Sequence, residues 1–489
     1  MAYEIGTATG VEDLLAKITT FLTTNATLVG LNQEWQVVRS AVDNVASIDT
    51  NLNSNNLNIA HTFNADPMLS NVSDPTTLTN LFYASNYTAN LSYFTIRLRQ
   101  AKEVRKIVIT SSHGDYADHM LTSFNLHGSN DGSSWTLVHS PSFTKPGAGN
   151  KVTISVPAST NYEYWRVTIT GGGSAGTILG WYSFLMYDVS DNIVNSYGSN
   201  VIFKSRGFAA NQEIFTGIKS VRSITAGWQN LILNGFTGYD PSVESWYKQP
   251  GAMVGYGIPE PRACPMVPGW PGAMKYWFVA SGNSFRLALK VSNTYESGYL
   301  GFLLPYATPG QYPYPLVVGG SHLSSSNDFL YSYVHQVRGV YCCPGSNTSS
   351  GSSYGSGTLN IRSGAGDWLQ YTDADNNVLS QEAVAGITVA DSTIGGMQRC
   401  VWPHSIYSSP TGKVRPYRDC YGGGYMFQPC IPIQRGPTRA VLGELEGTYF
   451  VSGFNVTSED TSTIGGKVHV IFQNTYRTTL NNYWALALE

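Results

Sequence analysis

The stretch LHGSNDGSSWTLV at residues 126–138 constrains the fold more than any other part of the sequence. Apolar residues at both ends frame a central run of turn formers. Gly128 and Gly132 stand where a tight turn needs positive φ. Asn130 and Asp131 supply short polar side chains that can close a turn onto the backbone. These residues predict a structural corner between two strands, and the alternative is that Asp131 serves as a metal ligand or general acid.

Residues 57–195 continue this pattern with short strands at regular spacing. Trp165, Val167 and Ile169 alternate with polar residues, which is typical of a strand with one buried face. Trp135 is then expected to cap the core with its large apolar ring. The same alternation recurs, between turn-forming residues, in the segments FTIRLRQ, VRKIVIT, SFNLHGS and KVTISVP. We therefore predict an all-β sandwich for this region.

The hairpin and a later strand together resemble one known domain family. The segment from Phe124 to Trp135, followed by Tyr164-Trp165-Arg166-Val167, is similar to the discoidin domain, also called the coagulation-factor C-type domain, of the galactose-binding jelly-roll class. The resemblance implies that the hairpin is structural and that loops at one end of the sandwich hold a ligand. The residues that carry it are Phe124, Leu126, Gly128, Asn130, Asp131, Gly132, Trp135, Trp165 and Arg166.

One loop within this region is a candidate for contact with a sugar. The sequence SSHGDYADH at residues 111–119 brings aromatic faces and polar side chains together. An ordinary solvated loop is the alternative interpretation. The candidate ligand-binding residues are His113, Asp115, Tyr116 and His119.

The N-terminal residues predict an amphipathic helix. Thr9 and Glu12 have the spacing of a capping box. A short helix cannot bury an apolar face alone, so this face packs on the β-rich part of its own chain or on a neighbouring subunit, and we expect docking and oligomerisation. Further along, EWQVVRSAV is either a strand or a short helix, and residues 49–58 form an Asn-rich linker. The apolar face consists of Val11, Leu14, Leu15, Ile18 and Leu22.

The residues from about 197 onward are rich in Gly and aromatic side chains, and segments such as FRLALKVS and KVHVIFQN have the pattern of strands. Together with MAYEIGTATGVEDLLAKITTFL at the start and NNYWALALE at the end, this region resembles a family of tailed-bacteriophage virion proteins. The discoidin-like region looks like a module inserted between the matching parts. We therefore expect a mainly β fold with a docking segment at 1–56, a sandwich at 57–195 and a β-rich assembly domain at 196–489.

The two resemblances imply a structural subunit of a phage virion, in the tail tip or baseplate, that is made and assembled in the cytoplasm of the bacterial host. Its partners are then other virion proteins, copies of itself and a host surface glycan. The alternatives are a carbohydrate-binding host-attachment protein such as a tail fibre, a collar, neck or capsid decoration protein, and a polysaccharide depolymerase. A depolymerase needs only two carboxylates brought together by folding, and a sequence does not reveal such a pair.

Composition and motifs argue against several other classes. Charged residues make up 12% of the chain and the net charge is −3 without a basic block, so we expect no nucleic-acid binding. The sequence has no signal-peptide pattern and no apolar run long enough to span a bilayer, so we expect no membrane insertion. Motifs of zinc proteases, serine hydrolases, P-loops and calcium loops are missing from it. We therefore predict no enzyme, no metal site and no cofactor.

Cysteines and aromatic residues each allow more than one interpretation. The six cysteines contain no C-x-x-C pair, and we expect free thiols in a reducing cytosol. The acidic sequence DADNN at 373–377 is expected to be a polar turn rather than a calcium site. A group of aromatic residues could form core, a subunit interface or a platform for saccharides, and we favour the interface. These residues are Trp270, Tyr276, Trp277, Tyr306, Tyr312 and Tyr314.

Overall fold

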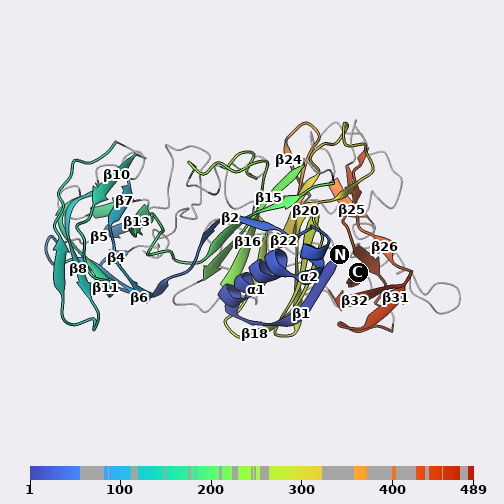
Figure 1. The fold of residues 1–489 in the computed structure, drawn as a ribbon, viewed down its shortest axis with the longest axis horizontal. Helices are drawn as coiled ribbons and strands as arrows, with labels where there is room; N and C mark the ends of the chain where they lie inside the picture. Colours follow the sequence, from blue (N-terminus) through green and yellow to red (C-terminus); the bar gives the residue numbers. More distant parts are fainter. Residues whose placement is uncertain are drawn as a thin grey trace, which may run out of the picture.

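The computed structural model shows a mainly β protein in which a sandwich lies at one end and a larger body holds both termini (Figure 1). This mainly β class agrees with the prediction from sequence. The structure describes residues 1–54, 82–85, 88–111, 119–147, 150–173, 178–181, 183–208, 212–222, 229–243, 246, 249–253, 264–321, 357–371, 399–402, 426–434, 440–453, 455–473 and 483–488. The DADNN sequence therefore lies outside the described residues.

Twelve strands form one large antiparallel sheet in the body. β1 pairs with β18 at one edge and β2 pairs with β14 at the other. Central strands such as β15 and β22 are buried almost along their whole length, because apolar layers cover both faces of the sheet. The strands are β1 (Ala2–Thr9), β2 (Gln36–Ala41), β14 (Asn200–Arg206), β15 (Glu213–Arg222), β16 (Gln229–Phe236), β17 (Met266–Gly269), β18 (Ala273–Ala280), β19 (Ser284–Val291), β20 (Thr294–Phe302), β22 (Leu316–Ser321), β23 (Gly357–Arg362) and β24 (Trp368–Tyr371).

Helix α1 (Gly10–Thr24) packs on one face of this sheet, followed by the short helix α2 (Ala26–Gly30) (Figure 1). The apolar face predicted from sequence is present and buried in the same core cluster as strands β15, β16 and β18. Its expected role in docking to other subunits is therefore corrected: the face is covered by the sheet of its own chain. The residues of the face are Val11, Leu14, Leu15, Ile18 and Leu22.

The start of α1 differs from the predicted capping box. The side chain of Thr9 makes no capping hydrogen bond. The Thr9 backbone N–H instead donates to Oδ2 of Asp13 at 2.8 Å. Glu12 is not available for the cap, because its carboxylate accepts hydrogen bonds from the hydroxyls of Ser199 and Ser220. Residues 2–9, for which no strand was predicted, form the edge strand β1 before the helix.

The opposite face of the large sheet is covered by C-terminal strands. Trp277 of β18 contacts Phe472 of β32 with ring centroids 4.9 Å apart, and Trp484 of β33 belongs to the same buried cluster. Small sheets of two and three strands extend this layer. The strands are β21 (Leu304–Pro305), β25 (Arg399–Trp402), β26 (Gln428–Pro429), β27 (Ile431–Gln434), β28 (Ala440–Val441), β29 (Gly443–Glu444), β30 (Thr448–Val451), β31 (Thr461–Ile464), β32 (Lys467–Gln473) and β33 (Tyr483–Ala487).

These two layers explain most of the aromatic residues that were expected at a subunit interface. Tyr276 faces the α1 side and Trp277 the C-terminal side, and both are buried, as is Tyr312. The interface assignment is wrong for these three. Tyr276 and Trp277 are consecutive residues of a strand with two covered faces, so each enters a core. Trp270 and Tyr314 are half-buried against the core, and Tyr306 is 54% exposed.

The sandwich contains the strands predicted from alternation. Trp165, Val167 and Ile169 of β11 are buried, and their neighbours along the strand are half-buried. Five strands form one sheet in the order β3-β6-β11-β8-β9, and two sheets of three strands complete the sandwich. The strands are β3 (Val45–Thr50), β4 (Asn53–Ser54), β5 (Phe82–Ser85), β6 (Tyr93–Lys102), β7 (Lys106–Thr110), β8 (Leu121–Ser129), β9 (Thr136–His139), β10 (Lys151–Ser155), β11 (Tyr162–Gly172), β12 (Ile178–Trp181) and β13 (Ser183–Tyr187).

The chain enters and leaves the sandwich at neighbouring positions of the large sheet. β2 ends at Ala41, which pairs with Asn200 at the start of β14. The Asn44 backbone N–H donates to the Ser196 carbonyl at 3.0 Å, so the two connecting segments also touch. The sandwich is thus inserted between two adjacent strands, while β1, α1 and β2 of the expected N-terminal segment belong to the large sheet.

Candidate functional site

The turn at residues 129–134 is closed by its own polar side chains. Oδ1 of Asp131 accepts the backbone N–H groups of Ser133 and Ser134 at 2.8 and 2.7 Å, and it also accepts the Ser129 hydroxyl at 2.9 Å. The Ser134 and Ser133 backbone bonds hold the pKa of Asp131 well below its usual range. Gly132 has φ +72°, as a turn glycine needs. An ionised carboxylate that already accepts several hydrogen bonds serves the turn and not acid catalysis.

Two residues of the motif have different roles from those expected. Gly128 lies inside β8 without positive φ. A Cβ there would lie 2.1 Å from the Tyr162 ring, so close packing is what requires glycine. Trp135 is half-buried and does not belong to the sandwich core, because it precedes β9 on the outer face of the sheet. The core position is taken by Trp165, which is fully buried, while Asn130 ties the turn to β11 by accepting the Glu163 N–H.

A row of aromatic and cationic side chains crosses the outer face of the five-stranded sheet. The Arg166 guanidinium lies between two rings, with its Cζ 4.1 Å from the Trp135 centroid and 4.4 Å from the Tyr93 centroid. Its Nε donates to the Thr95 hydroxyl at 2.9 Å. Stacking over two π faces and one hydrogen bond fix this side chain in place. The sequence motif contains Trp135 and Arg166 but gives no signal that they touch.

His127 is the nearest titratable neighbour of this row. It lies directly opposite Arg166 on strand β8. Burial, and next the positive charge of Arg166, lower the pKa of His127. Its ring is therefore neutral near pH 7, and Arg166 carries the positive charge of this cross-strand pair. Nδ1 of His127 is buried and has no hydrogen-bond partner in the described part of the chain.

The predicted sugar-contact segment stands between two strands in the sequence. β7 ends at Thr110 and β8 begins at Leu121. His119 is half-buried just before β8. The other three candidate residues, His113, Asp115 and Tyr116, lie outside the described residues.

A buried ionic cluster joins the sandwich to the body, and sequence reasoning missed it. Asp43 lies between β2 and β3 with its side chain 2% exposed, and its Oδ2 lies 2.8 Å from Arg222 and 3.1 Å from Arg99. Arg99 belongs to the sandwich and Arg222 to the large sheet, so one carboxylate links both units. Glu12 of α1 lies nearby, and burial followed by the charge of Asp43 raises its pKa. Residues so distant in sequence carry no local motif.

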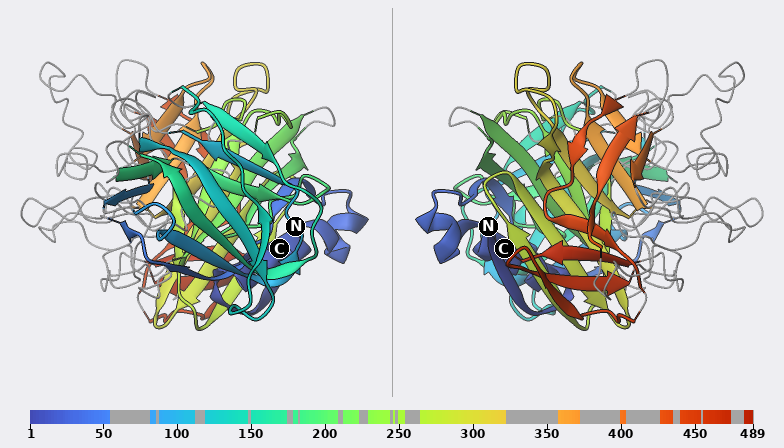
Figure 2. Two further views of the ribbon diagram at one scale, coloured as in Figure 1. Left: turned by 90° about the vertical axis from the view of Figure 1, so that its left-hand side faces the viewer. Right: turned by 90° about the vertical axis from the view of Figure 1, so that its right-hand side faces the viewer.

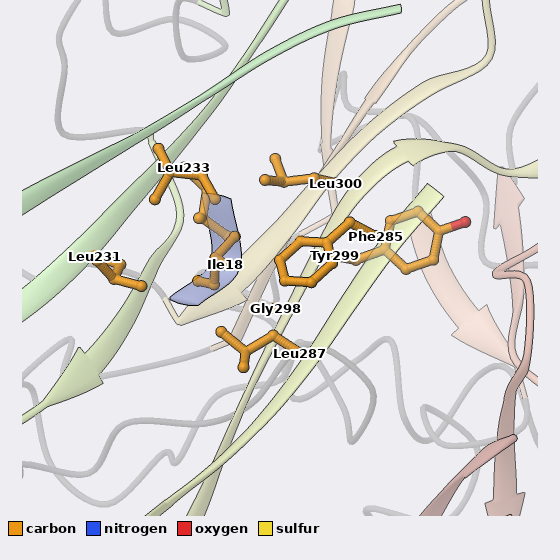
Figure 3. Close-up of a pocket in the computed structure, with 9 residues that line it drawn as sticks. Ile18, Leu231, Leu233, Phe285, Leu287, Gly298, Tyr299 and Leu300 are labelled. Carbon is orange, nitrogen blue, oxygen red and sulfur yellow. The ribbon is translucent and has the colours of Figure 1, made fainter. Parts of the chain in front are cut away.

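A small gap in the body core offers nothing for chemistry. It lies between α1 and the large sheet, and its lining side chains are apolar apart from Tyr299 (Figure 3). The Tyr299 hydroxyl points away from the others and donates to the Phe302 carbonyl at 2.7 Å. Among the described residues, no group of three His, Cys, Asp or Glu side chains could hold a metal ion. Within the same ranges, no helix has the length and apolar character needed to cross a membrane.

The described cysteines bear on only part of the thiol prediction. Cys264 and Cys430 are buried and free. Burial raises the pKa of the Cys430 thiol to about 12, so this thiol is unreactive near neutral pH.

Comparison with known proteins identifies the sandwich. Residues 61–183 match the model of the F5/8 type C domain. Among curated proteins no match is found. The sandwich is thus a jelly-roll discoidin domain within a mainly β chain.

Several solved structures resemble part of the chain. One is a family 32 module, CBM32-1, of a family 31 glycoside hydrolase from Clostridium perfringens, with 15% identity over 30% of this chain and 97% of that chain and a TM-score of 0.22. Another is the family 32 carbohydrate-binding module of Streptococcus pneumoniae EndoD, with 15% identity, 32% and 95% coverage and a TM-score of 0.22. A third is the family 32 module of C. perfringens NanJ in complex with galactose, with 14% identity, 29% and 91% coverage and a TM-score of 0.21.

Proposed function

We propose that the discoidin domain binds a glycan and that the body anchors it in a larger assembly. The match of residues 61–183 to the F5/8 type C domain carries the first half of this proposal. The outer face of the sandwich supports it, because aromatic rings and uncharged polar side chains there can pack on a sugar ring and hydrogen-bond its hydroxyls. We thus propose that the protein is a binding and structural subunit and not an enzyme.

The arrangement of the body supports the second half. The segments that resemble phage virion proteins, at the two ends of the sequence, come together in the layers around the large sheet. The two termini lie close to each other, away from the sandwich (Figure 1). An inserted domain at one end and a framework at the other suit a subunit that displays a binding domain. We therefore propose a location in a tailed-phage virion, in the tail tip or baseplate, with other virion proteins and copies of itself as partners.

A glycan array tests the binding proposal with the full chain. We expect saturable binding to a restricted set of glycans, which the free sugar abolishes by competition. His119→Ala, at the loop end, is expected to weaken this binding, whereas Val189→Ala, an exposed residue beyond β13, serves as the matched control. A folded chain that binds no glycan on an array including bacterial surface polysaccharides would contradict the proposal.

Purified particles test the proposed location. Mass spectrometry is expected to find the chain at a fixed copy number in particles of its phage, and labelled antibody against the sandwich is expected to bind the tail tip in electron micrographs. A chain found only in the lysate, and never in purified particles, would show that the virion role is wrong.

A further inference from the structure

In the part of the chain that the structure describes, one arginine of the sandwich lacks the ion pair that each of the other three arginines forms. The sandwich contains four arginines, and three of them form ion pairs with carboxylates. Within the described residues, the fourth, Arg166, has no carboxylate partner. Arg166 is therefore a half-buried guanidinium without an ion pair among the described residues. The three ion pairs are Arg97–Glu163, Arg99–Asp43 and Arg105–Glu103.

Arg166 is also held ready for an anion. The rings of Trp135 and Tyr93 clamp the guanidinium from two sides, and Thr95 occupies only its Nε. The terminal nitrogens Nη1 and Nη2 have no hydrogen-bond partner among the described residues. Their fork matches the two oxygens of a carboxylate. Because the side chain is already immobilised, binding an anion would cost little additional conformational entropy.

We propose that Arg166, with Trp135 and Tyr93, forms a subsite for the carboxylate of an acidic sugar on the outer face of the five-stranded sheet. This inference rests on the proposed glycan binding and adds a class of ligand to it. The carboxylate accepts two hydrogen bonds from Nη1 and Nη2. The sugar ring packs its C–H face on the adjacent apolar surface, where Leu137 is 56% exposed. A small anion without a ring lacks this second contact.

The subsite is distinct from the predicted sugar-contact loop. Arg166 lies in the middle of β11, opposite Thr95 and His127, whereas Ser111 follows the end of β7 and His119 precedes β8. The sandwich faces the viewer in the left-hand view of Figure 2, with its strands in front of the body.

The test compares two sugars that differ at one carbon, D-galacturonate and D-galactose, with the full-length protein at low salt. We expect D-galacturonate to bind ~10-fold more tightly than D-galactose, since a bidentate charged hydrogen bond gives at least that factor. Its methyl ester should lose the advantage, and Arg166→Lys should remove it. Arg97→Lys, which alters a neighbouring arginine paired with Glu163, should keep it. Bound D-galacturonate should also raise the pKa of His127 in an NMR titration, because it offsets the charge of Arg166.

These results test the proposed acidic-sugar subsite and leave the proposed glycan binding to a separate experiment. Equal affinity for the two sugars overturns it, as does a preference for D-galacturonate that survives in Arg166→Lys or leaves His127 unchanged. Acetate binding as tightly as D-galacturonate would overturn the assignment to a sugar. Absence of any D-galacturonate binding also overturns the inference. In that case, binding of neutral glycans on the glycan array still tests the proposed function.

Discussion

The five-stranded sheet of the sandwich and the large sheet of the body bury their strands in different ways. In β11 of the sandwich, buried residues alternate with half-buried ones, so one face remains open. In β15 of the body, eight consecutive residues are buried, with Ile218 facing α1 and Gly217 packed against Trp246 on the other face. A sheet with both faces covered is a framework, whereas a sheet with one open face can carry polar groups for a ligand. This difference supports the proposed anchoring by the body and the proposed recognition by the sandwich.

The fold of the body is expected to depend on the buried face of α1. Replacing Leu14 and Leu15 together by Asp places two carboxylates in the core cluster under the helix. Because an unpaired buried charge costs several kcal/mol, we expect ~5 kcal/mol or more of destabilisation and loss of the folded body. Thermal unfolding followed by circular dichroism measures this. Ala16→Asp on the exposed side of α1 should change little, and a double variant that melts like the wild type would show that α1 is not part of the core.

Two tryptophans of the sandwich, Trp165 and Trp135, are expected to contribute differently to its stability. Trp165 is fully buried and its indole N–H donates to the Lys102 carbonyl at 3.2 Å. Trp165→Ala should cost ~3–5 kcal/mol of unfolding free energy, as large core truncations do. Trp135→Ala should cost only ~1 kcal/mol, because it removes a stack on Arg166 and no core contact. Denaturant titration of both variants tests this, and equal losses would return Trp135 to the core.

Buried and half-buried residues alternate along the sandwich strand β11, and this alternation made the strand predictable from the sequence. In β11, every second residue is apolar and buried, as Trp165, Val167 and Ile169 show. The strand and its inner face were therefore predicted correctly. In β18, adjacent aromatic residues enter opposite cores, and a continuous apolar run does not tell a buried strand from an interface. The wrong assignment of Tyr276 and Trp277 followed from this ambiguity.

The site was predictable only in part for a related reason. Local turn chemistry at Asp131 and Gly132 could be read from a few adjacent residues. The stack of Trp135 on Arg166 and the cluster at Asp43 join residues from different strands, and register decides which of them meet. The apolar stripe of α1 showed that a partner surface exists but could not say whether that surface belongs to the same chain.

The junction between the two regions should respond to pH through Glu12. Burial and then the charge of Asp43 raise the pKa of Glu12 above its ordinary value of 4.5, although the Ser199 and Ser220 hydroxyls and Arg222 act in the opposite direction. The folded protein thus holds this proton more tightly than the unfolded chain does. The stabilisation by Glu12 is complete below pH 4.5 and is lost as pH rises through the raised pKa.

Glu12→Gln removes this titration. The Tm of the variant minus that of the wild type should therefore be more positive at pH 8 than at pH 4. The pH dependence is measured by calorimetry in matched buffers, with Asp13→Asn on the exposed side of the helix start as control. The same difference in Tm at both pH values would show that Glu12 does not carry a raised pKa.

The smallest expected effect concerns the turn of the sandwich. Gly132→Ala forces an L side chain into φ +72° and brings its Cβ to 3.2 Å from the Tyr164 ring. We expect a loss of ~1 kcal/mol, and a smaller loss for Gly132→Asn, since Asn visits this conformation more readily. Denaturant titration distinguishes the two variants. If Gly132→Ala costs nothing, the positive φ does not restrict this position.

The central claim is that the body folds without the inserted sandwich and that the sandwich alone accounts for glycan binding. Because Asn44 and Ser196 are joined by a hydrogen bond, residues 45–195 can be replaced by an Asn-Gly turn that leaves the Asp43–Arg222 pair in place. The decisive measurement is glycan-array binding by this shortened chain beside the full chain. We expect a cooperatively folded body that binds none of the glycans bound by the full chain. A shortened chain that keeps this binding would show that the sandwich is not the binding unit.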